Sequence, residues 1–547
     1  MSNRGTLFRG PSLFFVYNEP MKYVTLTLSG TFAETAPQTG SLRAVGSSKR
    51  FRFDTFLLSV EKILGDRRIR RVLIDCRPDF APRLFAGAEA VREQLDRLCR
   101  SGKELYFYAR EYDQLRLYLG SVCSVRIIHP LGHLSFFGVA RPFLFFKNLI
   151  EKQKIESEIL RRGEYKSAGD RFRTDSLDPE NREQYQAYLD RVTGEFEEQV
   201  EHGFNKSKGD LQEFVNGTML TAQAARQEGW IEEIDTLSRR LQEWKEEKVR
   251  EQKLKKLGRS YGKGRKKIAV LVFEGAIIDG ESRELPGLGQ ALGDSSYVPQ
   301  IRKLAEDKSV KGVVFRVNSG GGSAVASEEI LSALRELRKK KPLVVSMSEL
   351  AGSGGYWIAL EAERIFAHNT TLTGSIGVIT MLFSLQKFLK RLGVTTETIR
   401  TGPHADLGSG LRSMTKEERK IMQAVVDDLY DTFVEKVAKA RGRPVEEVEA
   451  VAKGRVWSGF DGVTRGLVDE VGGLTEAVEY LRSSLQLKRA TVAFYPEVKR
   501  SFLQRLILKN APVTVPAGVG ETARLLATLR GPLALMPEAV RPEELLG

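Results

Sequence analysis

The sequence predicts an α/β protein built from two tandem repeats of one domain. Apolar runs of strand length alternate with amphipathic runs of helical length, the pattern of strand–helix units with parallel pairing. The chain also repeats itself, because residues 136–163 align without a gap to residues 375–402 at an offset of 239. Residues 217–234 resemble residues 454–471 at an offset of 237. Each copy therefore spans roughly two hundred residues.

The second copy shows its elements most clearly. Its predicted strands, which are continuously apolar and so should be buried on both faces, are residues 267–273, 312–317 and 342–347. A glycine loop at Gly320, Gly321 and Gly322 follows the second strand, and a helix is predicted over 324–338 with Ser323 as its N-cap. A turn of small residues and a further helix follow the third strand.

The first copy has the same order of elements but not the same loop. Strands are predicted over 71–75 and 104–108, with a helix over 88–100 between them. Residues 77–80, Arg-Pro-Asp-Phe, stand where the second copy has its glycines. The predicted organisation is an N-terminal extension (1–20), a first repeat (21–240), a linker (241–266), a second repeat (267–490) and a C-terminal extension (491–547).

The charge of the chain is concentrated in that linker. The net charge is +14, and the pI is near 9.4, which favours acidic partners. Much of the excess lies between Lys245 and Lys267, which we interpret as a solvated basic linker, helical up to Gly258 and flexible through Gly264. No nucleic-acid-binding motif is present, so we expect no nucleic-acid partner.

Composition also argues against a metal centre. The chain has three cysteines and five histidines, with no His/Cys pair at ligand spacing. We therefore predict neither a metal nor another cofactor.

No membrane-spanning segment is expected. The sequence has no run of eighteen apolar residues, and Leu13-Phe14-Phe15-Val16 is too short for a signal-peptide core. This predicts a cytoplasmic protein or one bound at a membrane surface. Residues 501–510 fit a basic amphipathic helix on anionic lipid, although an ordinary packing helix is the preferred interpretation.

Ser353 has the local setting of a nucleophile. It lies in residues 351–357, Ala-Gly-Ser-Gly-Gly-Tyr-Trp, between a predicted strand and a predicted helix. The glycines permit a sharp bend, and the N–H groups of a helix start favour an oxyanion. The motif nearly matches the Gly-x-Ser-x-Gly elbow of hydrolases. Taken alone, however, a close-packed helix start explains it better.

The duplication connects Ser353 with Lys166. At the offset of 239, Ser353 aligns with Gln114, and Lys166 aligns with Ala405. One copy retains a potential nucleophile and the other a potential base, as expected if both build a single site. A free lysine titrates near pH 10.4, so half-deprotonation near neutral pH needs about 4 kcal/mol, which burial can supply.

Several alternatives stay open on this evidence. The N–H groups of residues 318–323 suit a phosphate or an oxyanion, but the loop fits neither the P-loop nor the dinucleotide pattern. His368 and His404 are rival bases, although no carboxylate is placed to complete a triad. Ser375 is a rival nucleophile, which we interpret as lining the site.

These motifs resemble serine peptidase family S49, in its long two-repeat form of the signal peptide peptidase A type. The resemblance covers roughly residues 20–490 and is strongest at residues 163–168, 316–323, 351–357, 372–378 and 456–459. It implies a crotonase/Clp-protease-like fold in each repeat. It also implies Ser353 as nucleophile, Lys166 as general base, and an oxyanion hole made by the N–H groups of Gly321 and Gly354. Peptide substrates, including signal-peptide remnants, and a homo-oligomer, expected to be a tetramer, are implied as well.

Two departures from the family pattern stand out. The usual Ser-Pro-Gly-Gly is Ser319-Gly320-Gly321-Gly322, which keeps the N–H groups. The N-terminal anchor of many relatives is not seen, so a membrane-associated protein facing the periplasm is the alternative location. Two other functions are considered beside the peptidase: an acyl-CoA hydratase or isomerase, and a non-catalytic scaffold with the same fold.

Overall fold

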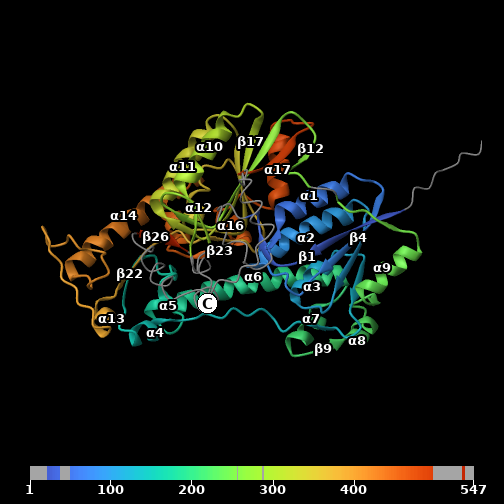
Figure 1. The fold of residues 1–547 in the computed structure, drawn as a ribbon, viewed down its shortest axis with the longest axis horizontal. Coiled ribbons are helices and arrows are strands. Elements are labelled where there is room, and N and C mark those ends of the chain that lie inside the picture. Colours follow the sequence, from blue (N-terminus) through green and yellow to red (C-terminus); the bar gives the residue numbers. More distant parts are fainter. Residues whose placement is uncertain (1–20, 37–49, 255–256, 286–288, 497–531, 536–547) are drawn as a thin grey trace, which may run out of the picture.

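Two sheets, one in each half, form the body of the molecule in a computed structural model; the first is parallel and the second is mainly parallel (Figure 1). The structure describes residues 21–36, 50–254, 257–285, 289–496 and 532–535. The first sheet is entirely parallel and has the order β10 (Glu233–Ile234), β6 (Val125–Ile128), β5 (Glu104–Ala109), β4 (Ile69–Cys76), β1 (Lys22–Leu28) and β11 (Arg250–Glu251).

The second sheet repeats this arrangement in the second half. Its order is β12 (Ser260–Gly262), β25 (Thr491–Tyr495), β13 (Lys267–Glu274), β17 (Val310–Ser319), β19 (Leu343–Gly352), β20 (Ile365–Ala367) and β24 (Glu470–Val471). The short strands β21 (Leu372–Gly374) and β23 (Val456–Ser458) extend it beside β19. The central pairs β13–β17 and β17–β19 are parallel, as strand–helix alternation predicts.

A third sheet joins the two halves. Its order is β15 (Arg283–Leu285), β16 (Gly289–Gly293), β14 (Ala276–Ile278), β18 (Gly321–Ser323), β26 (Pro532–Leu535), β22 (Val378–Ser384) and β8 (Glu156–Arg162). Only β8 comes from the first half. It pairs antiparallel with β22 along seven residues, from Val378 opposite Arg162 to Ser384 opposite Glu156. Two small ribbons, β2 (Thr31–Ala33) with β3 (Arg50–Arg52) and β7 (His133–Ser135) with β9 (Met219–Thr221), complete the strands.

The helices repeat with the sequence. Those of the first half are α1 (Phe53–Leu64), α2 (Phe85–Arg100), α3 (Gln114–Gly120), α4 (Lys147–Lys152), α5 (Asp170–Arg173), α6 (Pro179–Phe204), α7 (Lys208–Val215), α8 (Ala222–Gln227) and α9 (Leu237–Glu246). Those of the second half are α10 (Asp294–Glu306), α11 (Ala324–Arg338), α12 (Gly354–Trp357), α13 (Gln386–Arg391), α14 (Lys416–Arg441), α15 (Val445–Val451), α16 (Gly459–Thr464) and α17 (Leu474–Ser484). Helices α4 and α13 are offset by 239 residues, and β9 and β23 by 237, so the duplication is present in three dimensions.

The two halves share a hydrophobic core. Alternate residues of β13 face opposite sides of its sheet, because successive side chains of a strand point in opposite directions. Ile268, Val270 and Val272 pack in the same cluster as Leu57 of α1 and Leu95 of α2. Their neighbours on the other face, including Leu271, pack with α11 and α14. Burial on both faces explains why the strand is continuously apolar.

Most predicted elements agree with the structure. The α/β fold with two repeats is confirmed, helix α11 spans residues 324–338 as predicted, and Ser323 caps it by accepting a hydrogen bond from the Ala326 N–H at 3.2 Å. The prediction of a helical linker up to Gly258 is wrong. Helix α9 ends at Glu246, and the chain then adds β11 to the first sheet and β12 to the second.

Other predictions concern segments that the structure does not describe. Residues 1–20 and the proposed lipid-binding helix over 501–510 lie outside the described residues. Within the described ranges, none of the helices combines the length and apolar character needed to cross a bilayer.

Candidate active site

Ser353 lies on a strained turn between β19 and α12. Its backbone has φ 56° and ψ −122°, a left-handed conformation that is costly for a residue with a side chain. Its N–H donates to the Gly374 carbonyl at 2.8 Å, and its side chain is fully buried. Strain of this kind typically marks functional turns.

The glycines beside Ser353 allow the turn to pack against the glycine loop. A Cβ on Gly355 would lie 2.2 Å from the Ser319 carbonyl oxygen, and one on Gly354 would lie 3.1 Å from the Cα of Gly321. Any larger residue would push the two backbones apart. The small residues around Ser353 are therefore required to bring two backbone segments, 319–321 and 353–355, together beside its hydroxyl.

Lys166 reaches this turn from the other half of the chain. Its side chain is buried, and its Nζ lies 2.6 Å from Ser353 Oγ, 3.0 Å from Ser375 Oγ and 2.9 Å from the Ser375 carbonyl oxygen. The three residues singled out in the sequence as nucleophile, base and lining residue thus meet at one point.

The pairing of β8 with β22 positions Lys166 next to Ser353. The strand ends at Arg162, and Gly163, with φ 105°, turns the chain back toward the second half. A Cβ at Gly163 would lie 2.4 Å from the Lys453 carbonyl carbon, and the Tyr165 N–H donates to the Lys453 carbonyl oxygen at 3.0 Å. Contacts across the repeat boundary therefore fix the loop that carries Lys166.

A buried polar network supports this loop from the first half. Asn181 and Gln184 on α6 are both buried. Asn181 Nδ2 donates to Asp170 Oδ2 at 2.7 Å, and Gln184 Nε2 donates to the Tyr165 carbonyl at 3.0 Å. Gln184 Oε1 also accepts from the Val456 N–H at 2.9 Å, which ties the loop to the second half. Sequence reasoning missed these residues, because polar side chains on an amphipathic helix look solvent-facing.

The two rival bases lie elsewhere. His368 is buried in the contact between the halves, with its Nε2 3.9 Å from Glu93 Oε2. Burial and the nearby positive charge of Arg316 lower the pKa of His368 to about 3. His404 Nδ1 lies 3.2 Å from Glu418 Oε1. Among the described residues, no hydrogen bond joins either histidine to Ser353.

The backbone groups singled out for an oxyanion are adjacent. Gly354 is the first residue of α12, so its N–H has no acceptor within that helix. The Gly321 N–H donates to Ser319 Oγ at 3.2 Å, a long bond that an oxyanion would have to replace. Gly321 has φ 95°, and Gly322 would place a Cβ 1.9 Å from the Ile277 carbonyl oxygen, so the loop depends on glycine.

Among the residues that the structure describes, the first half has no equivalent centre. Gln114 opens α3 where Ser353 precedes α12, and Arg116 fills the region of the missing glycine loop. Its guanidinium donates to the carbonyl oxygens of Arg77, Pro78 and Phe80 at 2.7, 3.1 and 3.4 Å. The described residues also contain no cluster of three His, Cys, Asp or Glu side chains arranged to hold a metal.

A buried serine on a strained turn, contacted by a buried lysine and flanked by paired backbone N–H groups, defines a candidate hydrolase of the serine type. Residues 97–250 and 335–488 each match Peptidase family S49, and together they exceed half of the chain. The chain belongs to peptidase family S49, as the sequence motifs predicted.

Individual relatives support this membership. The "Serine protease SPPA, chloroplastic" of Arabidopsis thaliana is 32% identical over 71% of this chain and 60% of its own length. "Protease 4" of Salmonella typhi is 31% identical over 80% of this chain, which spans 73% of that relative. A solved structure of a ClpP1 mutant from Listeria monocytogenes covers 38% of this chain with a TM-score of 0.26 and 15% identity, too slight a likeness to bear on the fold.

Proposed function

We propose that the protein is a serine endopeptidase with a Ser-Lys dyad that cleaves signal-peptide remnants or other apolar, unfolded peptides. The observation that carries the proposal is the 2.6 Å contact between Lys166 Nζ and Ser353 Oγ, made across the two halves. Membership of a serine peptidase family supports the reaction class.

In the proposed reaction, neutral Lys166 accepts the hydroxyl proton of Ser353 as Oγ attacks the scissile carbonyl. The resulting ammonium then donates a proton to the leaving amine as the C–N bond breaks, leaving an ester on Ser353. Water, activated by the same lysine, hydrolyses this ester. Ser375, whose hydroxyl and carbonyl oxygens both face Nζ, positions the amine throughout.

The oxyanion of each tetrahedral intermediate would be held by the N–H groups of Gly321 and Gly354. Their backbones are packed together, and preorganised donors of this kind typically contribute about 3–4 kcal/mol each to transition-state stabilisation. The Ser319 hydroxyl, which now accepts from Gly321, would have to rotate away.

An apolar substrate fits the surroundings of the dyad. Close to it, Ile379 and Met381 of β22 are buried in one apolar cluster with Ala168, and Ile159, Phe172 and Phe383 are partly buried against that cluster. An acyl-CoA hydratase or isomerase would also use paired N–H groups, but it would not need a serine in contact with a buried lysine.

A probe of serine reactivity and a peptide assay test this function on the purified full chain. A fluorophosphonate should label Ser353 and block cleavage of a quenched apolar peptide. Labelling absent from the folded protein, with no peptide turnover, would favour a non-catalytic scaffold. Turnover of an enoyl-CoA by the Ser353→Ala protein would favour the hydratase.

We also propose that copies of the chain assemble head to tail, as a tetramer. The internal repeat supports this assembly, since β8 of the first half pairs with β22 of the second half within one chain. At the offset of 239, the second-half counterpart of β8 is residues 395–401, and the first-half counterpart of β22 is residues 139–145. Neither counterpart lies in a strand of the described structure, and Ile399 in the first is 98% exposed.

Residues 395–401 of one copy would therefore pair with residues 139–145 of the next. An interface between two different surfaces generates a closed ring when the rotation between copies allows it.

For the location, we propose the cytoplasm or the surface of an anionic membrane. The alternative, suggested by the family resemblance, is a membrane-associated protein that faces the periplasm.

A further inference from the structure

The strand that leads to Ser353 is irregular just before the serine. Strands β17 and β19 pair residue for residue up to Val317 opposite Met347. The next matched pair is Ser319 with Ala351, so β19 takes four steps where β17 takes two. A bulge, residues 348–350, therefore lies in β19 immediately before the nucleophile turn. Bulges bend a strand and change the direction of the side chains that follow.

The equivalent strands of the first half are regular. Strands β4 and β5 stay in register along the whole length over which they pair. At the offset of 239, the bulge aligns with residues 109–111, where β5 ends. Two residues of extended chain span about 7 Å, so a ladder without the bulge would shift Ser353 by roughly that distance relative to the glycine loop. The bulge therefore helps to determine where the nucleophile lies.

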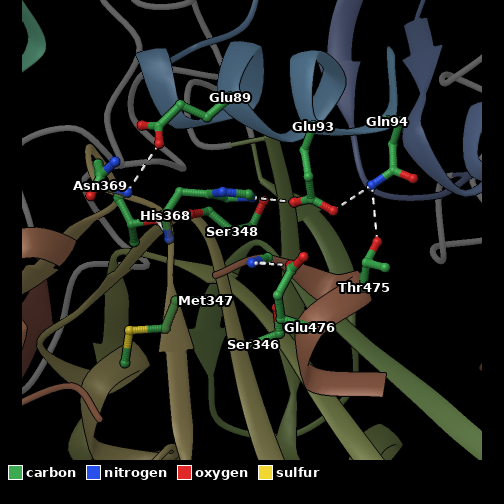
Figure 2. A network of polar contacts seen from close by, with 12 residues as sticks. Glu89, Glu93, Gln94, Ser346, Met347, Ser348, His368, Asn369, Thr475 and Glu476 are labelled. Atoms are coloured by element: carbon green, nitrogen blue, oxygen red, sulfur yellow. Dashed lines mark hydrogen bonds and ion pairs between the residues drawn. The ribbon is translucent and has the colours of Figure 1, made fainter. Parts of the chain in front are cut away.

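A buried ion pair between the halves holds the start of the bulge. Glu34 of the first half and Arg316 on β17 are both buried, with Glu34 Oε1 3.0 Å from Arg316 Nη2. The Ser348 hydroxyl donates to the Glu34 carboxylate and accepts from Arg316 Nη2 at 3.1 Å. Arg316 Nη1 also donates to the Met347 carbonyl at 3.0 Å. Figure 2 shows Met347 and Ser348 below helix α2 of the first half.

Glu349, in the middle of the bulge, caps that helix. Helix α2 follows Leu84 and has no side-chain cap of its own. The buried Glu349 Oε1 instead accepts from the Arg83 N–H at 2.8 Å and from the Leu84 N–H at 2.9 Å. Oxygen acceptors are favoured at this end of a helix, because its first N–H groups have no partner within the helix. A Cβ on Gly87, in the first turn, would lie 2.7 Å from the same oxygen.

Leu350 completes the contact with the first half. It is buried in one apolar cluster with Tyr188 and Val192 of α6, and Leu84 and Phe85 are partly buried against that cluster. Helix α6 also supports the loop that carries the lysine. Each of the three residues of the bulge is therefore held by the first half: one through its hydroxyl, one through its carboxyl group and one through apolar packing.

We propose that the first half fixes the bulge of β19 and thereby positions Ser353, with Glu349 as the principal positioning residue. The inference rests on the proposed function and gives the first half a second contribution besides Lys166. Glu349 acts through the strand, so its loss should lower kcat and leave the KM nearly unchanged. A misplacement of about 1 Å can cost roughly 100-fold in rate.

Substitutions of Glu349 separate its hydrogen bonds from its bulk. Glu349→Met keeps a side chain of similar length but has no oxygen acceptor, whereas Glu349→Gln keeps an acceptor for the Arg83 and Leu84 N–H groups. Glu195→Met is the matched control for a lost contact between the halves. Glu195 is also buried, and it accepts from Asn369 Nδ2 at 2.8 Å.

A second pair of variants leaves β19 itself unchanged. Gly87→Ala places a methyl group against the Glu349 carboxyl, although an alanine within a helix otherwise favours folding. Gly194→Ala is its control, because Gly194 also lies within a helix, α6, and has open space where a Cβ would point. A purely structural role predicts normal kcat in both glycine variants whenever they are folded at the assay temperature.

The state of the bulge is measured first, without reliance on catalysis. Hydrogen exchange of residues 348–353 should speed up in Glu349→Met and Gly87→Ala, and should match the wild type in Glu349→Gln, Glu195→Met and Gly194→Ala. Identical exchange in all of these proteins would overturn the inference, whether or not the protein is a peptidase.

Kinetics on a quenched apolar peptide then test positioning. In Glu349→Met and Gly87→Ala, kcat should fall at least about tenfold with the KM within about twofold of the wild type, and Glu349→Gln should restore most of the rate. Normal kcat despite faster exchange would reject the positioning role. An equal loss in Glu349→Gln would reject the role of the carboxyl oxygen as acceptor. No turnover by the wild type, together with the exchange differences, would reject the proposed function and leave the contact that holds the bulge in place.

Discussion

Gly454 and Lys166 are packed so closely that no side chain fits between them. A Cβ on Gly454 would lie 2.6 Å from the Cβ of Lys166 and 2.7 Å from its backbone nitrogen. Gly454 has φ 77°, and its N–H donates to the Ile376 carbonyl at 2.7 Å, so its position is fixed by the second half. A glycine of one repeat thus sets the position of the lysine of the other.

This contact predicts the effect of Gly454→Ala. The methyl group must displace the Lys166 backbone, and a misplacement of about 1 Å can cost roughly 100-fold in rate. We expect kcat for peptide cleavage to fall by about that factor while the chain stays folded. Gly217→Ala is the matched control, because Gly217 aligns with Gly454, has φ 109° and has open space where a Cβ would point. Equal kcat in the two variants would argue against positioning by Gly454.

Removal of the lysine amine should abolish turnover. Lys166→Met keeps a chain of similar volume but no base, and we expect kcat to fall by at least about 10³-fold, as for the loss of other catalytic bases. Lys341→Met is the control, since Lys341 is also buried and donates to the backbone carbonyls of Leu304 and Asp307, and it precedes β19 whereas Ser353 follows the opposite end of that strand. Measured by quenched-peptide assay, normal kcat in Lys166→Met would reject the dyad.

The contact between the halves contains carboxyl groups that should make stability depend on pH. Figure 2 shows Glu89 and Glu93 on α2 facing His368 and Asn369 of the second half. Glu89 accepts from the Asn369 N–H at 3.0 Å, the Thr370 N–H at 2.8 Å and the Thr370 hydroxyl. Burial and the nearby charge of Glu195 nevertheless raise its pKa from 4.5 to about 8, and burial and Glu476 do the same for Glu93.

A carboxyl group whose pKa is higher in the folded protein stabilises the fold in its protonated form. Its contribution is complete below the unfolded pKa of 4.5 and is lost as the pH rises through about 8. We therefore expect the thermal midpoint to fall as the pH rises through about 8, and Glu89→Gln, which stays neutral, to reduce this fall. Glu213→Gln, on the exposed face of α7, should leave the profile unchanged. A wild-type midpoint that does not fall across this range would contradict the assignment.

The proposed assembly predicts the effect of a charge at Ile399. If residues 395–401 pair with residues 139–145 of a neighbouring copy, Ile399→Asp places a carboxylate in that contact, and light scattering after size exclusion should show a shift from tetramer to monomer. Leu131→Asp is the control, because Leu131 is 89% exposed but lies outside both segments. An unchanged mass for Ile399→Asp, or a monomeric wild type, would reject this interface.

Structural features that depend on residues close together in the sequence could be predicted from it. The apolar runs that became β13, β17 and β19 are continuous because both faces of their sheet are buried, and the cap at Ser323 depends only on its near neighbours. The Lys- and Glu-rich composition of the linker after Glu246 favours a helix, and this is why the sequence predicted one there. In the structure the segment forms strands instead, with β11 pairing at the end of the first sheet and β12 at the end of the second.

The supporting residues of the site were not accessible in this way. Asn181 and Gln184 are buried only because α6 packs beside the loop that carries Lys166, and nothing in their spacing distinguishes them from exposed residues of the same helix. His368 looked as suitable a base as the lysine until the fold placed it beside Glu93.

By itself, the sequence determined that the chain is a duplicated α/β protein in which one copy kept Ser353 and the other Lys166, because periodicity and repetition are written along the chain. Only the tertiary structure decided that the two side chains lie 2.6 Å apart, and that β26 lies beside them. The physical reason is that the contacting residues are far apart in the sequence, 187 positions in the case of Lys166 and Ser353. Such contacts depend on strand pairing and on close packing of glycines, and neither produces a recognisable pattern in the neighbouring sequence.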